Sequence, residues 1–141
     1  MPKDLPPRSM LHDDLWLWEW SGTLGRIHHA LYLACREQAG CEASPTAAII
    51  DSQSGKSAEK GAYIDPHGFD AGKKIKGKKR HVLVDTQGLM LHAVVHSAGL
   101  QDRDGGALLV ATLFGLYPFL RKRYADFGYQ EPRFKDAWSR P

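Results

Sequence analysis

Two aspartates are the residues of this chain whose type and spacing best suit catalysis. Asp51 follows the apolar run 47–50, and Asp126 follows the short segment 122–125, which also has strand character. If the two segments form neighbouring strands, both carboxylates emerge at one edge of the sheet. There they could share divalent cations, as two-metal phosphoryl transfer requires. The alternative is that these acids only cap loops and helices, and the spacing alone leaves both interpretations open.

A run of basic residues without an intervening acid lies between the two aspartates. It consists of Lys73, Lys74, Lys76, Lys78, Lys79 and Arg80. One interpretation is a solvated loop and strand edge, because lysine at an edge discourages pairing between sheets. The other is a patch that contacts phosphates. The net charge of +3 is only mildly basic, so it does not decide between them.

Length and composition narrow the class of protein. A chain of 141 residues can bury one sizeable core. Its content of 43% hydrophobic and 25% charged residues is typical of a soluble globular protein and not of a disordered chain or a fibre. No apolar stretch approaches the roughly 18 to 20 residues of a membrane span, and the N-terminus has no signal-peptide core. We therefore expect a cytoplasmic protein with no membrane partner.

Other chemistries have weaker support. Cys35 and Cys41 form neither a disulfide framework nor a metal site, and Cys35 is interpreted as a small apolar residue on a helix. The histidines do not have the spacing of a zinc site, since His92 and His96 lie on an expected strand. Ser52 has no histidine that the sequence can pair with it, so nucleophilic catalysis is unsupported.

The N-terminal third is expected to be irregular and then helical. Alternating tryptophans at 16–20 suit either a short strand or the end of a helix, and so short a window does not decide. Residues 23–38 have helical periodicity, with Thr23 as the expected N-cap and Gly40 as the C-terminal stop. The expected apolar stripe consists of Leu24, Ile27, Leu31, Ala34 and Cys35.

The remainder of the chain predicts a mixed α/β sheet with incomplete helical cover. The run 47–50 favours a strand buried on both faces, and the composition of 55–77 predicts a long loop. Residues 78–85 and 89–96 predict a β-hairpin that turns at Gly88, with Asp85 as a turn residue. A helix is expected at 107–116, with Asp102 and Asp104 at its start and Pro118 ending it, followed by a strand at 122–125.

Several motifs resemble those of one transposase family. Residues 47–54 resemble the first catalytic-strand motif of insertion-sequence transposases of family five, and 69–88 resemble the basic loop and hairpin of that family. Residues 101–105 and 125–129 continue the match in the same order, and 2–9 are similar to the segment that precedes the catalytic domain. The resemblance covers nearly the whole chain.

The resemblance implies a ribonuclease-H-like fold, incomplete here, with an Asp, Asp, Glu triad that binds Mg²⁺ or Mn²⁺. Asp51 and Asp126 match the first and second catalytic, metal-binding aspartates, and Lys73 to Arg80 match residues that would contact DNA phosphates. Glu131 lies too close to Asp126 to be the glutamate, which is not assigned. Phe127 and Gly55 depart from the Gly and Val usual in the family. We expect a fragment truncated at both ends, with an N-terminal segment at 1–43 and a partial catalytic domain at 44–141.

The expected function is DNA transposition by cutting and joining at transposon ends, with cleavage weak or absent in this chain alone. Expected partners are transposon-end and target DNA, together with a second copy or a full-length transposase, in the nucleoid. An alternative is a DNA-binding or inhibitory partner of a full-length transposase, without catalysis. A third hypothesis is that the chain is a decayed gene product of marginal stability.

Overall fold

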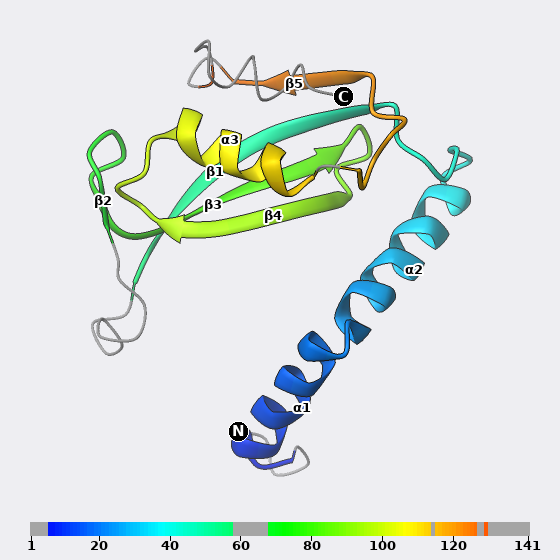
Figure 1. Cartoon of the computed structure of the whole chain (residues 1–141), viewed down its shortest axis with the longest axis horizontal. Helices are drawn as coiled ribbons and strands as arrows, with labels where there is room; N and C mark the ends of the chain where they lie inside the picture. Colours follow the sequence, from blue (N-terminus) through cyan, green and yellow to red (C-terminus); the bar gives the residue numbers. More distant parts are fainter. Residues whose placement is uncertain (1–5, 58–67, 114, 127–128, 130–141) are drawn as a thin grey trace. The chain divides into compact units, whose positions relative to one another are not determined.

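The chain forms two compact units, Met1–Ala43 and Ser44–Pro141, which are coloured along the sequence in Figure 1. The computed structural model describes residues 6–57, 68–113, 115–126 and 129. Part of the expected loop (58–67) and the positions Phe127 and Glu131 lie outside the described residues.

Two helices, α1 (Arg8–Trp20) and α2 (Thr23–Gln38), make up the described part of the first unit. The alternating tryptophans thus belong to a helix and not to a strand. Gly22 separates the two helices because its backbone is left-handed, with φ +69°, a conformation in which glycine has no steric penalty. None of the thirteen described residues of α1 is buried.

The predicted ends of α2 are correct at one terminus only. Thr23 is the first helical residue and not the N-cap; its hydroxyl accepts a hydrogen bond from Arg26 Nη2 at 2.9 Å, while Gly22 takes the cap position. Gly40 ends the helix as predicted, with φ +70°. The amides of Gly40 and Cys41 donate to the carbonyls of Glu37 and Arg36, which is the Schellman arrangement.

The expected apolar stripe is not the buried side of α2. Leu31 is 61% exposed and Cys35 is exposed, whereas Tyr32 and Arg36 are buried. The Arg36 guanidinium lies 5.8 Å from the centre of the Tyr32 ring, and Arg36 Nε donates to the carbonyl of Glu42 at 2.6 Å. Periodicity missed this side because long polar side chains bury apolar stems while their tips remain hydrogen-bonded.

The second unit is built on a five-stranded mixed sheet. Its strands are β1 (Ala47–Lys56), β2 (Gly68–Asp70), β3 (Ile75–Asp85), β4 (Met90–Ser97) and β5 (Lys122–Ala125). β3 pairs antiparallel with β1, β2 and β4, and β5 pairs parallel with β1. The helix α3 (Asp102–Thr112) connects β4 to β5, since strands that run in the same direction need a crossover. It packs on β3 and β4, over one face of the sheet (Figure 1).

The predicted hairpin is confirmed as β3 and β4. Gly88 has φ +79°, as the turn requires. Asp85 is the predicted turn residue: its Oδ1 accepts hydrogen bonds from the amides of Gln87 and Leu89 at 2.8 and 3.0 Å. Because these bonds replace water, the Asp85 carboxylate can be buried at the end of the strand.

Two predicted boundaries were wrong. The expected loop 55–77 begins with the end of β1 and contains β2 and the start of β3, because backbone pairing overrides the low apolar content of this segment. The expected helix 107–116 is observed as Asp102–Thr112, so Pro118 does not terminate it. Asp102 and Asp104 lie in its first turn, as predicted, where the helix dipole favours acids.

The two faces of the sheet differ. Side chains of β1 alternate, so that Ala48 and Ile50 are buried on the same face as Leu83, the face on which α3 packs, whereas Ile49 is 40% exposed on the opposite face. The prediction that this strand is buried on both faces was therefore wrong. We call the face opposite α3 the exposed face.

Gly105, in the first turns of α3, allows the helix to lie close to the sheet. A Cβ there would stand 2.2 Å from His81 Nε2 and 2.5 Å from His96 Nε2. Gly105→Ala should therefore lower the free energy of unfolding by about 1–3 kcal/mol, through overpacking. Urea unfolding followed by circular dichroism measures this. Gly55→Ala is the matched control, because a Cβ at Gly55 meets nothing within 4 Å. Equal stability of the two variants would contradict the close packing.

Candidate metal centre and the buried network beside it

Parallel pairing of β1 with β5 brings Asp51 and Asp126 together. Ile49 pairs with Tyr124 and Ile50 with Ala125, so the next residue on each strand is an aspartate. Neighbouring strands lie about 4.8 Å apart. Both aspartates are exposed. The register therefore sets two solvent-accessible aspartates at adjacent positions where the parallel pairing ends.

The sequence predicted that Asp51 ends its strand, and this prediction was wrong. β1 continues to Lys56, and beyond Asp51 its partner among the described strands is β3. Asp51 Oδ1 accepts a hydrogen bond from the amide of Ser52 at 2.8 Å. The strand on both sides of Asp51 is thus held by β3, which gives the carboxylate a rigid base.

The donor chemistry of this pair fits a hard divalent cation. Mg²⁺ and Mn²⁺ prefer oxygen ligands, and Mg²⁺ is often bound through one or two carboxylates together with water and phosphate oxygens. Within residues 6–57, 68–113, 115–126 and 129, no three or more His, Cys, Asp or Glu side chains are grouped so that they could hold a metal. The described site is therefore a two-carboxylate site.

A buried tyrosine follows Asp126. Tyr129 is 4% exposed, and its amide donates to the carbonyl of Asp126 at 3.1 Å. Its phenol oxygen is hydrogen-bonded to His81 Nδ1 at 2.9 Å, with the two rings edge to face and their centres 5.9 Å apart. Burial raises the pKa of Tyr129 above its ordinary value; a hydrogen bond with Ser52 opposes this effect.

The negative charges of three aspartates add to the raised pKa of Tyr129. They are Asp102, Asp51 and Asp126. The phenol therefore lies within electrostatic range of both members of the carboxylate pair and stays protonated at neutral pH.

His81 stacks on His96 beneath α3. The ring centres are 4.9 Å apart, and both Nε2 atoms are buried with no hydrogen-bond partner among the described residues. Burial, and then the neighbouring His96, lower the pKa of His81 to about 4, so its imidazole is neutral at physiological pH. Sequence analysis did not single out His81. The feature that could have identified His81 as buried is the alternation of β3, in which Lys79, His81 and Leu83 lie on the buried face.

Lys79 is buried in an ion-pair network on the same face of β3. Its ammonium lies 2.8 Å from Asp102 Oδ1 and 3.1 Å from Asp70 Oδ2. A hydrogen bond from Ser54, together with bonds from Lys79 and the amide of Lys73, holds the pKa of Asp70 well below its usual range. Burial acts to lower the pKa of Lys79, but the bonds to both aspartates outweigh it and raise that pKa. Asp70 and Lys79 are therefore both charged at neutral pH.

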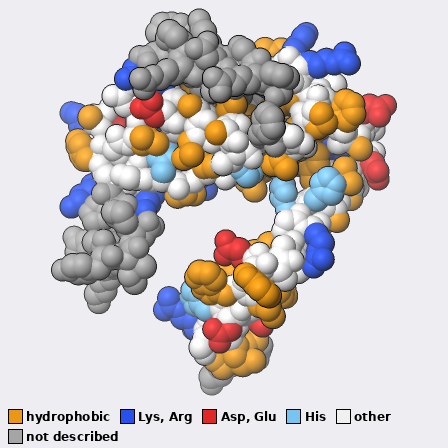
Figure 2. Space-filling view, viewed as in Figure 1, with side chains coloured by type: hydrophobic (Ala, Val, Ile, Leu, Met, Phe, Trp, Pro, Cys, Tyr) orange, Lys and Arg blue, Asp and Glu red, His pale blue; other side chains and the backbone are white. Residues whose placement is uncertain are grey.

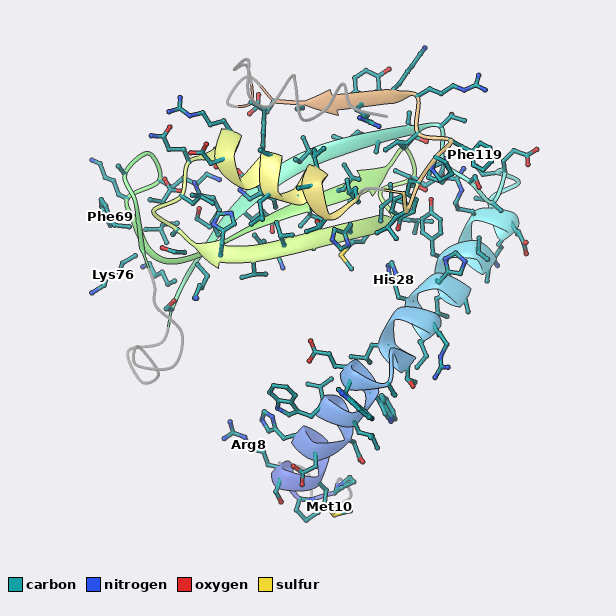
Figure 3. All side chains as sticks on the ribbon, viewed as in Figure 1. Arg8, Met10, His28, Phe69, Lys76 and Phe119 are labelled. Atoms are coloured by element: carbon teal, nitrogen blue, oxygen red, sulfur yellow. The ribbon has the colours of Figure 1, made fainter. Side chains whose placement is uncertain are left out.

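The structure separates Lys79 from the other five basic residues of the run 73–80. Lys79 is 4% exposed and its ammonium is used by Asp70 and Asp102. Lys76, Lys78 and Arg80 alternate with it along β3 and so project to the exposed face, the face of Asp51. Lys73 and Lys74 are exposed between β2 and β3. Figure 3 labels Lys76 beside Phe69, its pairing partner on β2, and Figure 2 shows the distribution of charges over one side of the molecule.

A family model described as "Transposase DDE domain" matches residues 42–140. The match covers more than half of the chain, which therefore belongs to the transposase DDE domain family. No curated relative and no solved structure matches the chain. Membership of this family implies DNA binding and a function related to transposition, and such domains generally use divalent metal ions. In the part of the chain that the structure describes, no helix is long and apolar enough to span a membrane.

Stability should depend on pH through His81. The pKa of His81 is about 4 in the folded chain and 6.5 ordinarily, so between these values the unfolded chain binds a proton that the folded chain does not. The contribution of neutral His81 to the free energy of unfolding is therefore fully present above about pH 6.5. It decreases as the pH falls toward 4, by up to about 3 kcal/mol.

Urea unfolding at several pH values measures this dependence. His81→Asn should flatten the pH profile, because it removes the titrating ring. His29→Asn, on the exposed surface of α2, is the matched control and should keep the wild-type profile. A wild-type profile that is already flat between pH 4 and 6.5 would contradict the assignment.

Proposed function

We propose that residues 44–141 belong to the catalytic domain of a cut-and-paste transposase of insertion-sequence family five, with residues 1–43 as a separate N-terminal segment. The observation that carries this proposal is the parallel register of β1 and β5, which brings Asp51 and Asp126 to neighbouring positions. The motifs around both aspartates resemble those of the same family. The match to the transposase DDE domain supports the coarser part of the proposal.

We further propose that the fold is ribonuclease-H-like. The support is topological: the antiparallel strands β1, β3 and β4 are followed by the crossover helix α3 and by β5, which pairs parallel to β1. In this order the two acidic positions come from strands that are adjacent in space and far apart in sequence. A catalytic site that needs two carboxylates side by side is built by such an arrangement.

In this proposal Asp51 and Asp126 hold Mg²⁺ or Mn²⁺. A bound ion of this kind supplies Lewis-acid stabilisation of a phosphoryl oxygen and lowers the pKa of bound water or hydroxyl. The residues of the chain contribute two accessible carboxylates, one of which is oriented by the amide of Ser52. No third acidic ligand is assigned, so cleavage by this chain alone should be weak or absent.

The exposed face would contact the DNA backbone. Lys76, Lys78 and Arg80 lie on the same face of the sheet as Asp51. Arg80 also donates to Gln53 Oε1 at 2.9 Å through Nε, which orients its guanidinium. Lysine and arginine contacts to phosphates position DNA without reading its sequence. Lys79 is left out of this role because its ammonium is buried between two aspartates.

Metal binding tests the carboxylate pair directly. Mn²⁺ affinity of the full chain, measured from the electron paramagnetic resonance signal of free Mn²⁺, should fall at least about tenfold in both Asp51→Ala and Asp126→Ala, because each removes one of two ligands. Asp14→Ala is the matched control, since Asp14 is an exposed acid on α1. If both active-site variants bound Mn²⁺ as the wild type does, the proposed metal site would be wrong.

The basic residues of the exposed face should set the salt dependence of DNA binding. Lys76→Ala or Arg80→Ala should each reduce the slope of log affinity against log salt by about 0.9 for duplex DNA, because one phosphate contact is lost. Lys56→Ala removes the same charge from an exposed residue of β1 that lies, by alternation, on the other face. Fluorescence anisotropy with a labelled duplex measures the slopes, and equal slopes for all three variants would argue against this surface.

A second candidate function is DNA binding or inhibition of a full-length transposase, without catalysis. The observation that favours it is the basic exposed face beside a site with only two carboxylates among the described residues. Nicking of supercoiled plasmid with Mn²⁺ tests the second candidate. Because the first candidate expects weak nicking at most, any nicking that is lost in both Asp51→Ala and Asp126→Ala overturns the second role. Salt-dependent binding without detectable nicking is the result that the second role requires.

A further inference from the structure

We propose that Tyr129 and His81 are positioning residues, whose buried hydrogen bond holds the Asp126 carboxylate beside Asp51. This inference rests on the proposed metal site. It assigns to two buried residues outside the carboxylate pair the task of setting the separation of the two carboxylates.

Asp126 needs such a support because strand pairing ends just before it. β5 has four residues, and the last pair in its register with β1 is Ile50 with Ala125. Asp126 itself is exposed. Three residues later, Tyr129 is buried and its amide donates to the carbonyl of Asp126, which closes a turn. Through this hydrogen bond, the buried Tyr129 restrains the backbone carbonyl of Asp126.

The Tyr129 ring is in turn attached to the strand beside Asp51. His81 is completely buried on β3 and pairs with Ser52, the residue next to Asp51. Its Nδ1 lies 2.9 Å from the Tyr129 phenol oxygen. The bond thus joins the turn of Asp126 to the two paired strands that hold Asp51.

The histidine end of this bond is rigid. The His81 ring is stacked on His96, and Gly105 of α3 covers the edge that carries Nε2. Because His81 is neutral, one of its nitrogens is an acceptor, and with Nε2 protonated Nδ1 accepts from the Tyr129 hydroxyl. Groups that orient metal ligands from behind commonly change metal affinity 10–100-fold when they are lost.

The test is Tyr129→Phe in the full chain, which keeps the ring and removes only the hydroxyl. The matched control is Tyr117→Phe, because the Tyr117 hydroxyl is also part-buried and donates to the carbonyl of Leu91 at 2.7 Å, away from β5. His81→Asn is the conservative variant that retains an acceptor near Nδ1. Two readouts are made on each: Mn²⁺ affinity, and hydrogen–deuterium exchange of the backbone around Asp126 without metal.

The proposal expects Tyr129→Phe to weaken Mn²⁺ binding about tenfold or more and to speed exchange around Asp126. Tyr117→Phe should leave both unchanged, and His81→Asn should lie between Tyr129→Phe and the wild type. Equal effects of the two tyrosine variants, or none in Tyr129→Phe, would overturn the proposal.

Failure of the metal site itself is distinguishable. If Asp51→Ala and Asp126→Ala bind Mn²⁺ like the wild type, the proposed metal site is wrong. The positioning role is then tested by hydrogen–deuterium exchange around Asp126 alone. Faster exchange around Asp126 in Tyr129→Phe, but not in Tyr117→Phe, supports the role of the Tyr129–His81 bond in holding the turn. Unchanged exchange overturns it.

Discussion

The parallel pairing of β5 with β1 is the constraint on which the arrangement of the second unit depends. Parallel neighbours cannot be joined by a tight turn, so the chain must cross over through α3 before β5 can reach β1. The helix that makes this crossing also packs on one face of the sheet, the face on which Ile50 and Leu83 are buried. The pairing of β5 with β1 thus requires the crossover through α3, which covers the core, and it sets Asp51 and Asp126 at adjacent positions.

The covered face carries charged and polar groups as well as apolar ones, and each is compensated in a different way. Lys79 is surrounded by Asp70 and Asp102, so its charge is kept by ion pairing. His81 is held neutral by burial and by the neighbouring His96, which together outweigh the negative charge of Asp102. Asp85 is satisfied by backbone amides of its own turn. Buried polar groups of this kind favour one packing of α3 over others, since a shift would leave them unpaired.

The exposed face has the opposite character. Asp51 lies there with Lys78 and Arg80, so that acidic and basic side chains share one accessible surface. For a domain of the transposase DDE family, this proximity is physically reasonable, because a polyanionic substrate approaches carboxylates only where cations and basic side chains offset the repulsion. The same alternation that buries Lys79 exposes its neighbours, and a run of lysines in sequence is therefore not a single patch in space.

Local patterns were sufficient for the hairpin around Gly88, for α2 and for the strand Lys122–Ala125, because turn chemistry and periodicity act over a few residues. They failed for Tyr32 and Arg36, and for the boundaries of β1 and α3. In these places burial and pairing with distant segments outweigh local preference.

The sequence by itself indicated the mixed α/β class, the two aspartates as candidates and, through its motifs, a transposase of the DDE class. Tertiary structure alone decided that Asp51 and Asp126 are neighbours, that Lys79 faces inward, and that Tyr129 bonds to His81. The reason is that side-chain types and short-range periodicity are properties of the chain. Strand register and the choice of buried face depend instead on contacts between residues far apart in sequence, which no local pattern encodes.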